Sequence, residues 1–134
     1  MSRRIFVDSL FVIALINRRD SYHRQAVSLA TSLRGQPLLL TDAILLEIGN
    51  GLARSYKKEA VAIIDHFLRA KEAEVVRLSP ELFGEAFDLY RSYRDKDWGM
   101  VDCVSFVVMR KHGAEAALTF DHNFVQAGFQ ALMR

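Results

Sequence analysis

The stretch RIFVDSLFVIALI, residues 4–16, predicts a short strand that runs directly into a helix. Arg4–Val7 is short and mainly apolar, as in a buried strand, and Ser9–Ile16 continues as a helix. Asp8 stands at the junction, where aspartate is favoured because its side chain can cap the first helical turn. A strand followed at once by a helix is the repeating unit of proteins with a parallel sheet.

The same alternation continues along the chain. Further strands are predicted at Leu38–Leu40, Glu74–Leu78 and Ala117–Phe120, with Phe129–Met133 as a last edge strand. Helices are predicted at Ser21–Leu33, from Thr41 or Asp42 to about Ser55, at Lys58–Ala70, from Ser79-Pro80-Glu81 to about Tyr93, at Met100–Lys111 and at Asp121–Gln126. This order predicts an α/β fold, a three-layer α/β/α sandwich with a mainly parallel central sheet.

The composition is that of a globular protein. The 134 residues are 51% apolar and 25% charged, with a net charge of +2, and we expect residues 1–134 to form a single domain. The lone cysteine, Cys103, excludes an internal disulfide, fits a reducing compartment and is expected to be a small buried side chain. No apolar run reaches the roughly 18 residues of a membrane span. We therefore expect a cytoplasmic protein with no membrane contact.

Four acidic residues stand inside apolar runs. Asp8, Glu47, Asp102 and Asp121 occur in IFVDSLFVIAL, DAILLEIGNGL, MVDCVSFVVM and AALTFDHNF. Burying a carboxylate without a partner costs several kcal/mol, so four such residues indicate a shared partner. A hard divalent cation bound through oxygen is the simplest partner for several carboxylates.

The predicted fold brings these acids together. Ligands of open parallel sheets bind beyond the carboxyl ends of the strands. Asp8 and Asp121 follow the ends of two predicted strands, Glu47 lies within two turns of the helix after a third, and Asp102 is near the start of the helix at Met100–Lys111. We therefore predict one acidic cluster at one edge of the sheet.

Several neighbouring residues have two interpretations. Asp8 and Asp121 could be helix caps only, and Asp42 is interpreted as a cap. Asp97 is a plausible cap of the helix that follows it, or could be a peripheral metal or water ligand. Ser9 and Thr119 could orient a carboxylate, or could satisfy turn backbone equally well, and Asn123 could hydrogen-bond within the site or belong to a loop.

Four strings together resemble the PIN-domain nucleases, and in particular the small VapC-type toxins of bacterial and archaeal toxin–antitoxin systems. They are VDSLFVIALI (residues 7–16), TDAILLEIGNGLAR (41–54), DKDWGMVDCVSFVVM (95–109) and ALTFDHNFVQAGF (117–129). Their order and spacing cover nearly the whole chain, and the last two are the most specific.

The resemblance implies a function for the acidic cluster. It implies that Asp8, Glu47, Asp102 and Asp121 are the catalytic acids and the ligands of Mg²⁺ or Mn²⁺, and that RNA is hydrolysed there. It also implies a homodimer and a cognate antitoxin whose tail enters the cleft. Basic residues would have to grip the phosphates that flank the cut; the nearest candidates in sequence are Arg18, Arg19, Arg54, Lys57 and Lys58.

Two other functions fit parts of the pattern. A phosphorylated receiver domain also has a parallel sheet and an acidic Mg²⁺ pocket, but it would need adjacent acids after the first strand and a lysine after a late strand. Asp8 is alone at the first position, and Asp121-His122-Asn123 offers no lysine. A catalytically silent PIN-type module that binds RNA or protein is the second alternative, against which the intact set of four acids argues.

Overall fold

Five strands form one parallel sheet in the computed structural model, which describes residues 3–134. The strand order is β3-β2-β1-β4-β5, and all four neighbouring pairs are parallel, as the sequence predicted. The strands are β1 (Ile5–Val7), β2 (Leu38–Thr41), β3 (Ala73–Val76), β4 (Ala116–Leu118) and β5 (Gln130–Ala131). The first strand of the chain is therefore the central one.

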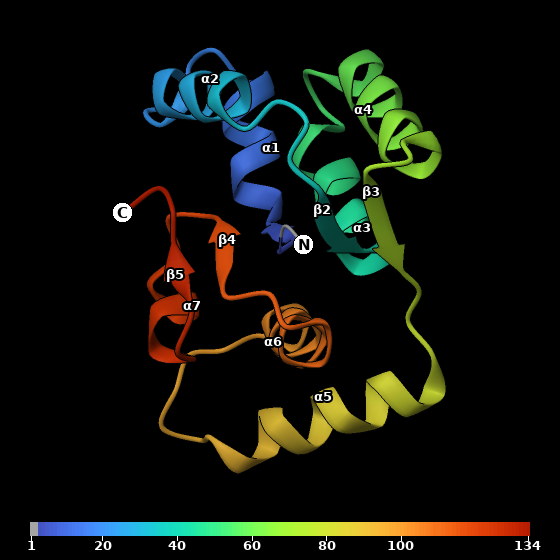
Figure 1. The fold of residues 1–134 in the computed structure, drawn as a ribbon, viewed down its shortest axis with the longest axis vertical. Helices are drawn as coiled ribbons and strands as arrows, with labels where there is room; N and C mark the ends of the chain where they lie inside the picture. The colour runs from blue at the N-terminus through green and yellow to red at the C-terminus, as the bar shows by residue number, and fades with distance from the viewer. Residues whose placement is uncertain (1–2) are drawn as a thin grey trace.

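Helices cover both faces of this sheet. They are α1 (Ser9–Ile16), α2 (His23–Ser32), α3 (Asp42–Leu52), α4 (Lys57–Arg69), α5 (Pro80–Ser92), α6 (Met100–His112) and α7 (His122–Gln126). The chain moves outward from β1 to β3 through α1–α4, then returns to β4 through α5 and α6. Because such crossovers are right-handed, α1–α4 lie on one face, and α5–α7 lie on the other (Figure 1). The predicted three-layer sandwich is confirmed.

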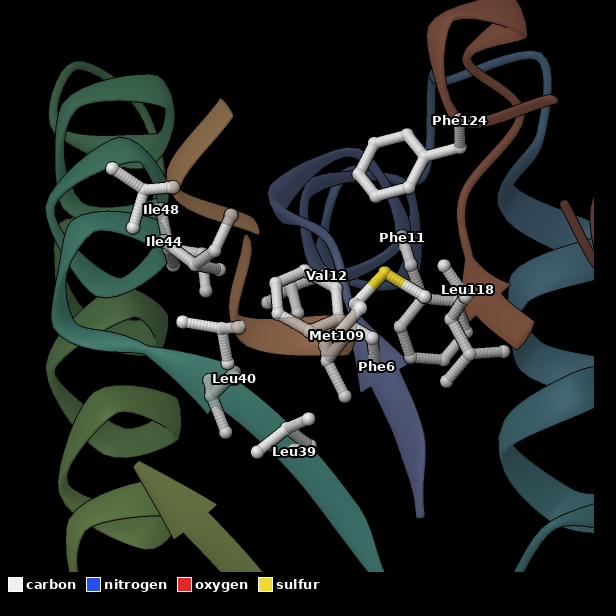
Figure 2. Close-up of a cluster of buried hydrophobic side chains, with 14 of the residues drawn as sticks. Phe6, Phe11, Val12, Leu39, Leu40, Ile44, Ile48, Met109, Leu118 and Phe124 are labelled. Carbon is white, nitrogen blue, oxygen red and sulfur yellow. The ribbon is translucent and has the colours of Figure 1, made fainter. Parts of the chain in front are cut away.

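The core fills both sides of the sheet and fixes its carboxyl edge. Figure 2 shows Phe6, Leu39 and Leu40 of the central strands close to Ile44 and Met109 of the covering helices. Phe106 of α6 packs edge-on against Phe124 of α7, with ring centroids 5.0 Å apart. These fully buried side chains hold α3, α6 and α7 in fixed positions beside the ends of β1 and β4.

The helix starts show one correction to the sequence analysis. Asp42 was expected to be a cap, but Thr41 caps α3, its hydroxyl accepting the Ile44 amide hydrogen at 3.2 Å. The Asp42 carboxylate instead accepts the Leu78 amide hydrogen at 3.0 Å and so holds the segment after β3. Ser79 caps α5 as predicted, and Gly113 ends α6 with a φ of 67°.

The other boundaries shift by a few residues. The strand predicted at Glu74–Leu78 begins one residue earlier, at Ala73, and ends at Val76, and the strand predicted at Phe129–Met133 shortens to Gln130–Ala131. α3 stops at Leu52 instead of about Ser55. Among residues 3–134, no helix combines the length and the apolar character that crossing a bilayer requires.

Candidate metal centre

Asp8 lies at the centre of the carboxyl edge of the sheet. It follows β1 directly. Its backbone amide nitrogen donates a hydrogen bond to the carbonyl oxygen of Leu118 at the end of β4, over 3.3 Å. The side chain is only 5% exposed. Although Asp8 is at the N-cap position of α1, its carboxylate makes no capping hydrogen bond. The capping interpretation therefore does not explain this acid.

Thr119 joins Asp8 to Asp121. Its buried hydroxyl donates to Oδ2 of Asp8 at 2.7 Å and accepts the Asp121 amide hydrogen at 3.0 Å. Asp121 in turn accepts the Asn123 amide hydrogen on Oδ1 at 2.9 Å, which caps α7. Of the two acids that could be helix caps, Asp8 and Asp121, only Asp121 makes a capping hydrogen bond. Thr119 contacts the site through Asp8 and also satisfies the backbone of the turn.

Asp102 is held from two sides at the start of α6. Its Oδ2 accepts the Gly99 amide hydrogen and the Asn123 side-chain amide, both at 3.1 Å. The bond to Gly99 is a capping interaction, which the sequence analysis did not expect of Asp102. Asn123 therefore belongs to the site, where it connects Asp102 and Asp121.

Glu47 is half-buried on α3, the helix that follows β2. Ser9, the first residue of α1, donates its hydroxyl hydrogen to Oε1 of Glu47 at 2.8 Å. One oxygen of each of Glu47, Asp102 and Asp121 is anchored in this way. Among the residues that the structure describes, the second oxygen of each accepts no hydrogen bond. The anchored carboxylates thus keep a free oxygen for a ligand.

Burial and mutual repulsion raise the pKa values of Asp8, Glu47 and Asp102. Burial raises the pKa of Asp8 to about 7, with Glu47 and Asp102 adding repulsion and the Thr119 hydrogen bond opposing the shift. Burial also raises the pKa of Glu47 and of Asp102, and Asp121 adds repulsion to both. The four predicted acids are therefore one electrostatically coupled cluster.

This cluster has no positive charge to balance it. Within residues 3–134, none of the four acids forms an ion pair with a lysine, arginine or histidine. Nor does any group of three or more histidine, cysteine, aspartate or glutamate side chains in that range lie close enough together to hold a metal ion by itself. Mg²⁺ does not require such a cage, because it keeps several waters and uses one or two carboxylates. Hard, uncompensated oxygens fit a hydrated divalent cation of this type.

The remaining candidates take different positions. Asp97 is exposed, and only its backbone carbonyl contacts the site, at 3.5 Å from the Asn123 amide nitrogen. Arg18 lines a separate hollow with Tyr56 and Glu59. Cys103 is fully buried as expected, and burial raises the pKa of its thiol to about 11. The cations that line a hollow reaching Gly99 are Arg91, Arg94 and Lys96, which the sequence analysis missed.

A known family matches this chain. The model of the PIN domain matches residues 5–130, which include all four acids. That match excludes the receiver-domain alternative, because it assigns nearly the whole chain to a different fold family.

Proteins of known name are similar over almost the same range. The chain is 31% identical over 126 residues to a 23S rRNA-specific endonuclease, VapC20, of Mycobacterium tuberculosis (strain CDC 1551 / Oshkosh), covering 93% of this chain and 95% of the relative. The protein of the same name from strain ATCC 25618 / H37Rv matches equally. The crystal structure of Mycobacterium tuberculosis VapC20, described as a sarcin-ricin loop cleaving toxin, aligns with a TM-score of 0.84 at 31% identity, over 93% of this chain and 95% of that one.

Proposed function

Because the chain belongs to the PIN-domain family, we propose that it is a metal-dependent endoribonuclease of the VapC type, with residues 1–134 acting as one nuclease domain. The observation that carries the proposal is the cluster of Asp8, Glu47, Asp102 and Asp121, which has free carboxylate oxygens and no ion-pair partner within residues 3–134. A silent binding module would have no need to keep these acids together against their repulsion.

The cluster provides what hydrolysis of a phosphodiester requires. When bound, a divalent cation would neutralise the scissile phosphate and lower the pKa of the attacking water. Asp8, Asp102 and Asp121 would hold it directly or through water, and their hard oxygens favour Mg²⁺ or Mn²⁺. Glu47, anchored by Ser9, would ligate the cation or orient the attacking water. Thr119 and Asn123 would keep the carboxylates in place.

The first test is cleavage by the purified protein. Labelled 23S rRNA is the first substrate to try, because the named relative acts on it. We expect cleavage with Mg²⁺ or Mn²⁺ and none in EDTA, since the free acids repel the phosphate. Returning Mg²⁺ in excess should restore cleavage. Undiminished cutting in EDTA would refute metal dependence, and the absence of cutting on any RNA would favour the silent module.

Thr119 offers a more specific prediction. Replacing Thr119 with Val keeps the shape but removes the hydroxyl that contacts both Asp8 and the Asp121 amide. We expect kcat/KM to fall about 10- to 100-fold, the usual cost of losing a residue that orients metal ligands. Thr119→Ser should recover most of the activity. Ser105→Ala removes a buried hydroxyl whose one hydrogen bond within residues 3–134 is to the Val101 carbonyl, and should serve as the neutral control.

The family also implies partners. We propose that the protein is the toxin of a toxin–antitoxin pair, that a cognate antitoxin inhibits it, that it forms a homodimer, and that it works in the cytoplasm. Leu46 of α3 and Val61 of α4 support a protein partner, because these side chains are 71% and 63% exposed. The sedimentation mass of the purified chain, alone and with the product of any adjoining gene, tests both associations.

A further inference from the structure

A groove lies where α5 ends and the chain turns toward α6. It has a volume of about 610 Å³. We call it the α5–α6 groove; its lining includes Tyr90, Tyr93, Arg94, Lys96, Trp98 and Gly99. The four acids are not among its lining residues, and the proposed catalysis gives this groove no role.

Residues that line the groove are hydrogen-bonded to residues of the acidic cluster and of α7. Gly99 lines the groove and donates its amide hydrogen to Asp102. Trp98 donates its indole hydrogen to Gln126 of α7 at 3.1 Å, so the wall of the groove is fixed against α7. A ligand that occupies the groove would therefore reach Gly99, the residue whose amide holds one of the four acids.

The groove exposes aromatic rings. Tyr90 and Tyr93 are each 44% exposed, and Phe87 on the same wall is 43% exposed. Trp98 is buried behind them, with its ring centroid 4.9 Å from that of Tyr93. Exposed rings held by a rigid wall are suited to stacking on unpaired bases, because every base presents an aromatic face.

The groove also carries positive charge. Three of its lining residues are cations, Arg91, Arg94 and Lys96, against one acid, Asp97. Two of these cations already have acidic partners. Arg91 is paired with Asp88 and lies over the Phe87 ring, and Lys96 is paired with Asp95 at 3.5 Å. Arg94 makes no ion pair or side-chain hydrogen bond with any residue in the range 3–134, so its charge is available to a ligand. Cations beside stacking rings complement a single-stranded nucleic acid.

We propose that the α5–α6 groove binds an unpaired stretch of the RNA substrate next to the scission site, with Tyr90 and Tyr93 stacking on bases and Arg94 contacting phosphate. This inference rests on the proposed ribonuclease function. It supplies what the acidic cluster lacks, since four carboxylates repel the backbone that they must cut. Unpaired RNA fits better than duplex RNA, whose bases are already stacked on one another.

Trp98 is the only tryptophan of the chain, and so its fluorescence reports on the groove. The test titrates wild-type protein, in EDTA, with a fluorescein-labelled single-stranded RNA of about ten nucleotides and with a hairpin of the same composition. The anisotropy of the labelled RNA gives the Kd. A second titration with unlabelled RNA follows the fluorescence emission of Trp98. We expect binding without metal, a change in Trp98 emission that saturates with it, and weaker binding of the fully paired stem.

Variants then locate the binding. Tyr90→Ala should weaken binding about tenfold, and Tyr90→Phe, which keeps the ring, should bind like wild type. Arg94→Gln should weaken binding about three- to fivefold at moderate salt and reduce the slope of log K against log salt by about 0.7. Arg24→Gln is the matched control, because Arg24 is exposed on α2, on the opposite face of the sheet. In cleavage assays the two groove variants should raise KM and leave kcat unchanged.

The outcomes separate this inference from the proposed function. If Tyr90→Ala and Arg94→Gln still cleave RNA with metal and bind it with an unchanged Kd, the proposed role of the groove is refuted and the proposed nuclease function stands. If RNA binding depends on both residues but the protein cuts no RNA, the groove is an RNA-binding site and the proposed nuclease function is refuted. A lower sedimentation mass for Tyr90→Ala, with unchanged RNA binding, would show that the aromatic wall contacts a second copy and would refute the proposal.

Discussion

Replacing Asp102 with Asn should reduce RNA cleavage at least about a thousandfold and leave the fold intact. Oδ2 of Asp102 is engaged by Gly99 and Asn123, and the asparagine oxygen can accept the same two hydrogen bonds. The free oxygen, however, becomes an NH₂ group that repels a cation. Losing one ligand charge removes several kcal/mol of transition-state stabilisation, and about 1.4 kcal/mol corresponds to a factor of ten in rate.

The measurement compares single-turnover rates on labelled RNA at saturating Mg²⁺. Asp65→Asn is the matched control, because Asp65 is an exposed acid on α4, and its rate should equal that of wild type. Circular dichroism and the melting temperature should show that Asp102→Asn folds normally. A variant that retains more than about a tenth of the wild-type rate would contradict the proposed role of Asp102.

Replacing Asp8 with Asn should have opposite effects on activity and on stability. Burial raises the pKa of Asp8 from 3.8 to about 7. Between these values the folded protein keeps a proton that the unfolded chain has lost. The free energy of unfolding of the metal-free protein therefore falls as pH rises from about 4 to about 7, and stays low above that range. The difference between the two pKa values of Asp8 corresponds to a loss of at most about 4 kcal/mol in the free energy of unfolding.

The neutral side chain of Asp8→Asn has no charge to bury. At pH 8 in EDTA the variant should melt about 5–10 °C above wild type, although cleavage is lost. At pH 4 the two proteins should melt together. The pKa of Glu47 and of Asp102 is also raised, first by burial, so the variant should remove only part of the pH dependence.

Added Mg²⁺ provides the control for this result. It should raise the melting temperature of the wild type at pH 8, because binding to the folded state alone is stabilising, and should do so much less for Asp8→Asn. Asp65→Asn should follow the wild type throughout. A metal-free wild type whose melting temperature does not change between pH 5 and 8 would contradict the raised pKa of Asp8.

The fold could be predicted from the sequence because its signals are local. The apolar strand at Leu38–Leu40 and the Ser79-Pro80 helix start each depend on a few adjacent residues, and both appear in the structure. The predicted ends of the strands were less accurate, because a strand extends only as far as it can pair with the neighbouring strand. β5 is short because only Gln130 and Ala131 find partners on β4.

The candidate site was partly predictable for a different reason. Strand order was not needed to foresee that Asp8 and Asp121 would meet, since carboxyl ends of parallel strands share one edge. The hydrogen bonds from Thr119 to Asp8 and from Asn123 to Asp102 depend on side-chain directions that no local pattern contains. The capping role of Asp102 was missed because Gly99, its partner, has no side chain to signal a cap.

The α5–α6 groove could not be predicted at all. Tyr90 lies on an amphipathic helix, where an aromatic side chain is usually interpreted as core. Only the tertiary structure shows it exposed beside Arg94, at the end of α5 nearest Gly99. The phosphate-binding cations proposed from the sequence, such as Arg18, were chosen by proximity along the chain, and Arg18 lines a different hollow.

The hydrogen bond between Thr119 and Asp8 joins residues 111 positions apart. During synthesis the ribosome makes β1 first, while β4 and α7 come near the end. Contacts of such long sequence separation form late, because closing a long loop costs entropy. A growing chain therefore exposes Asp8 and Glu47 well before Asp121 exists. The order of translation itself therefore delays the assembly of the acidic cluster until the chain is nearly complete.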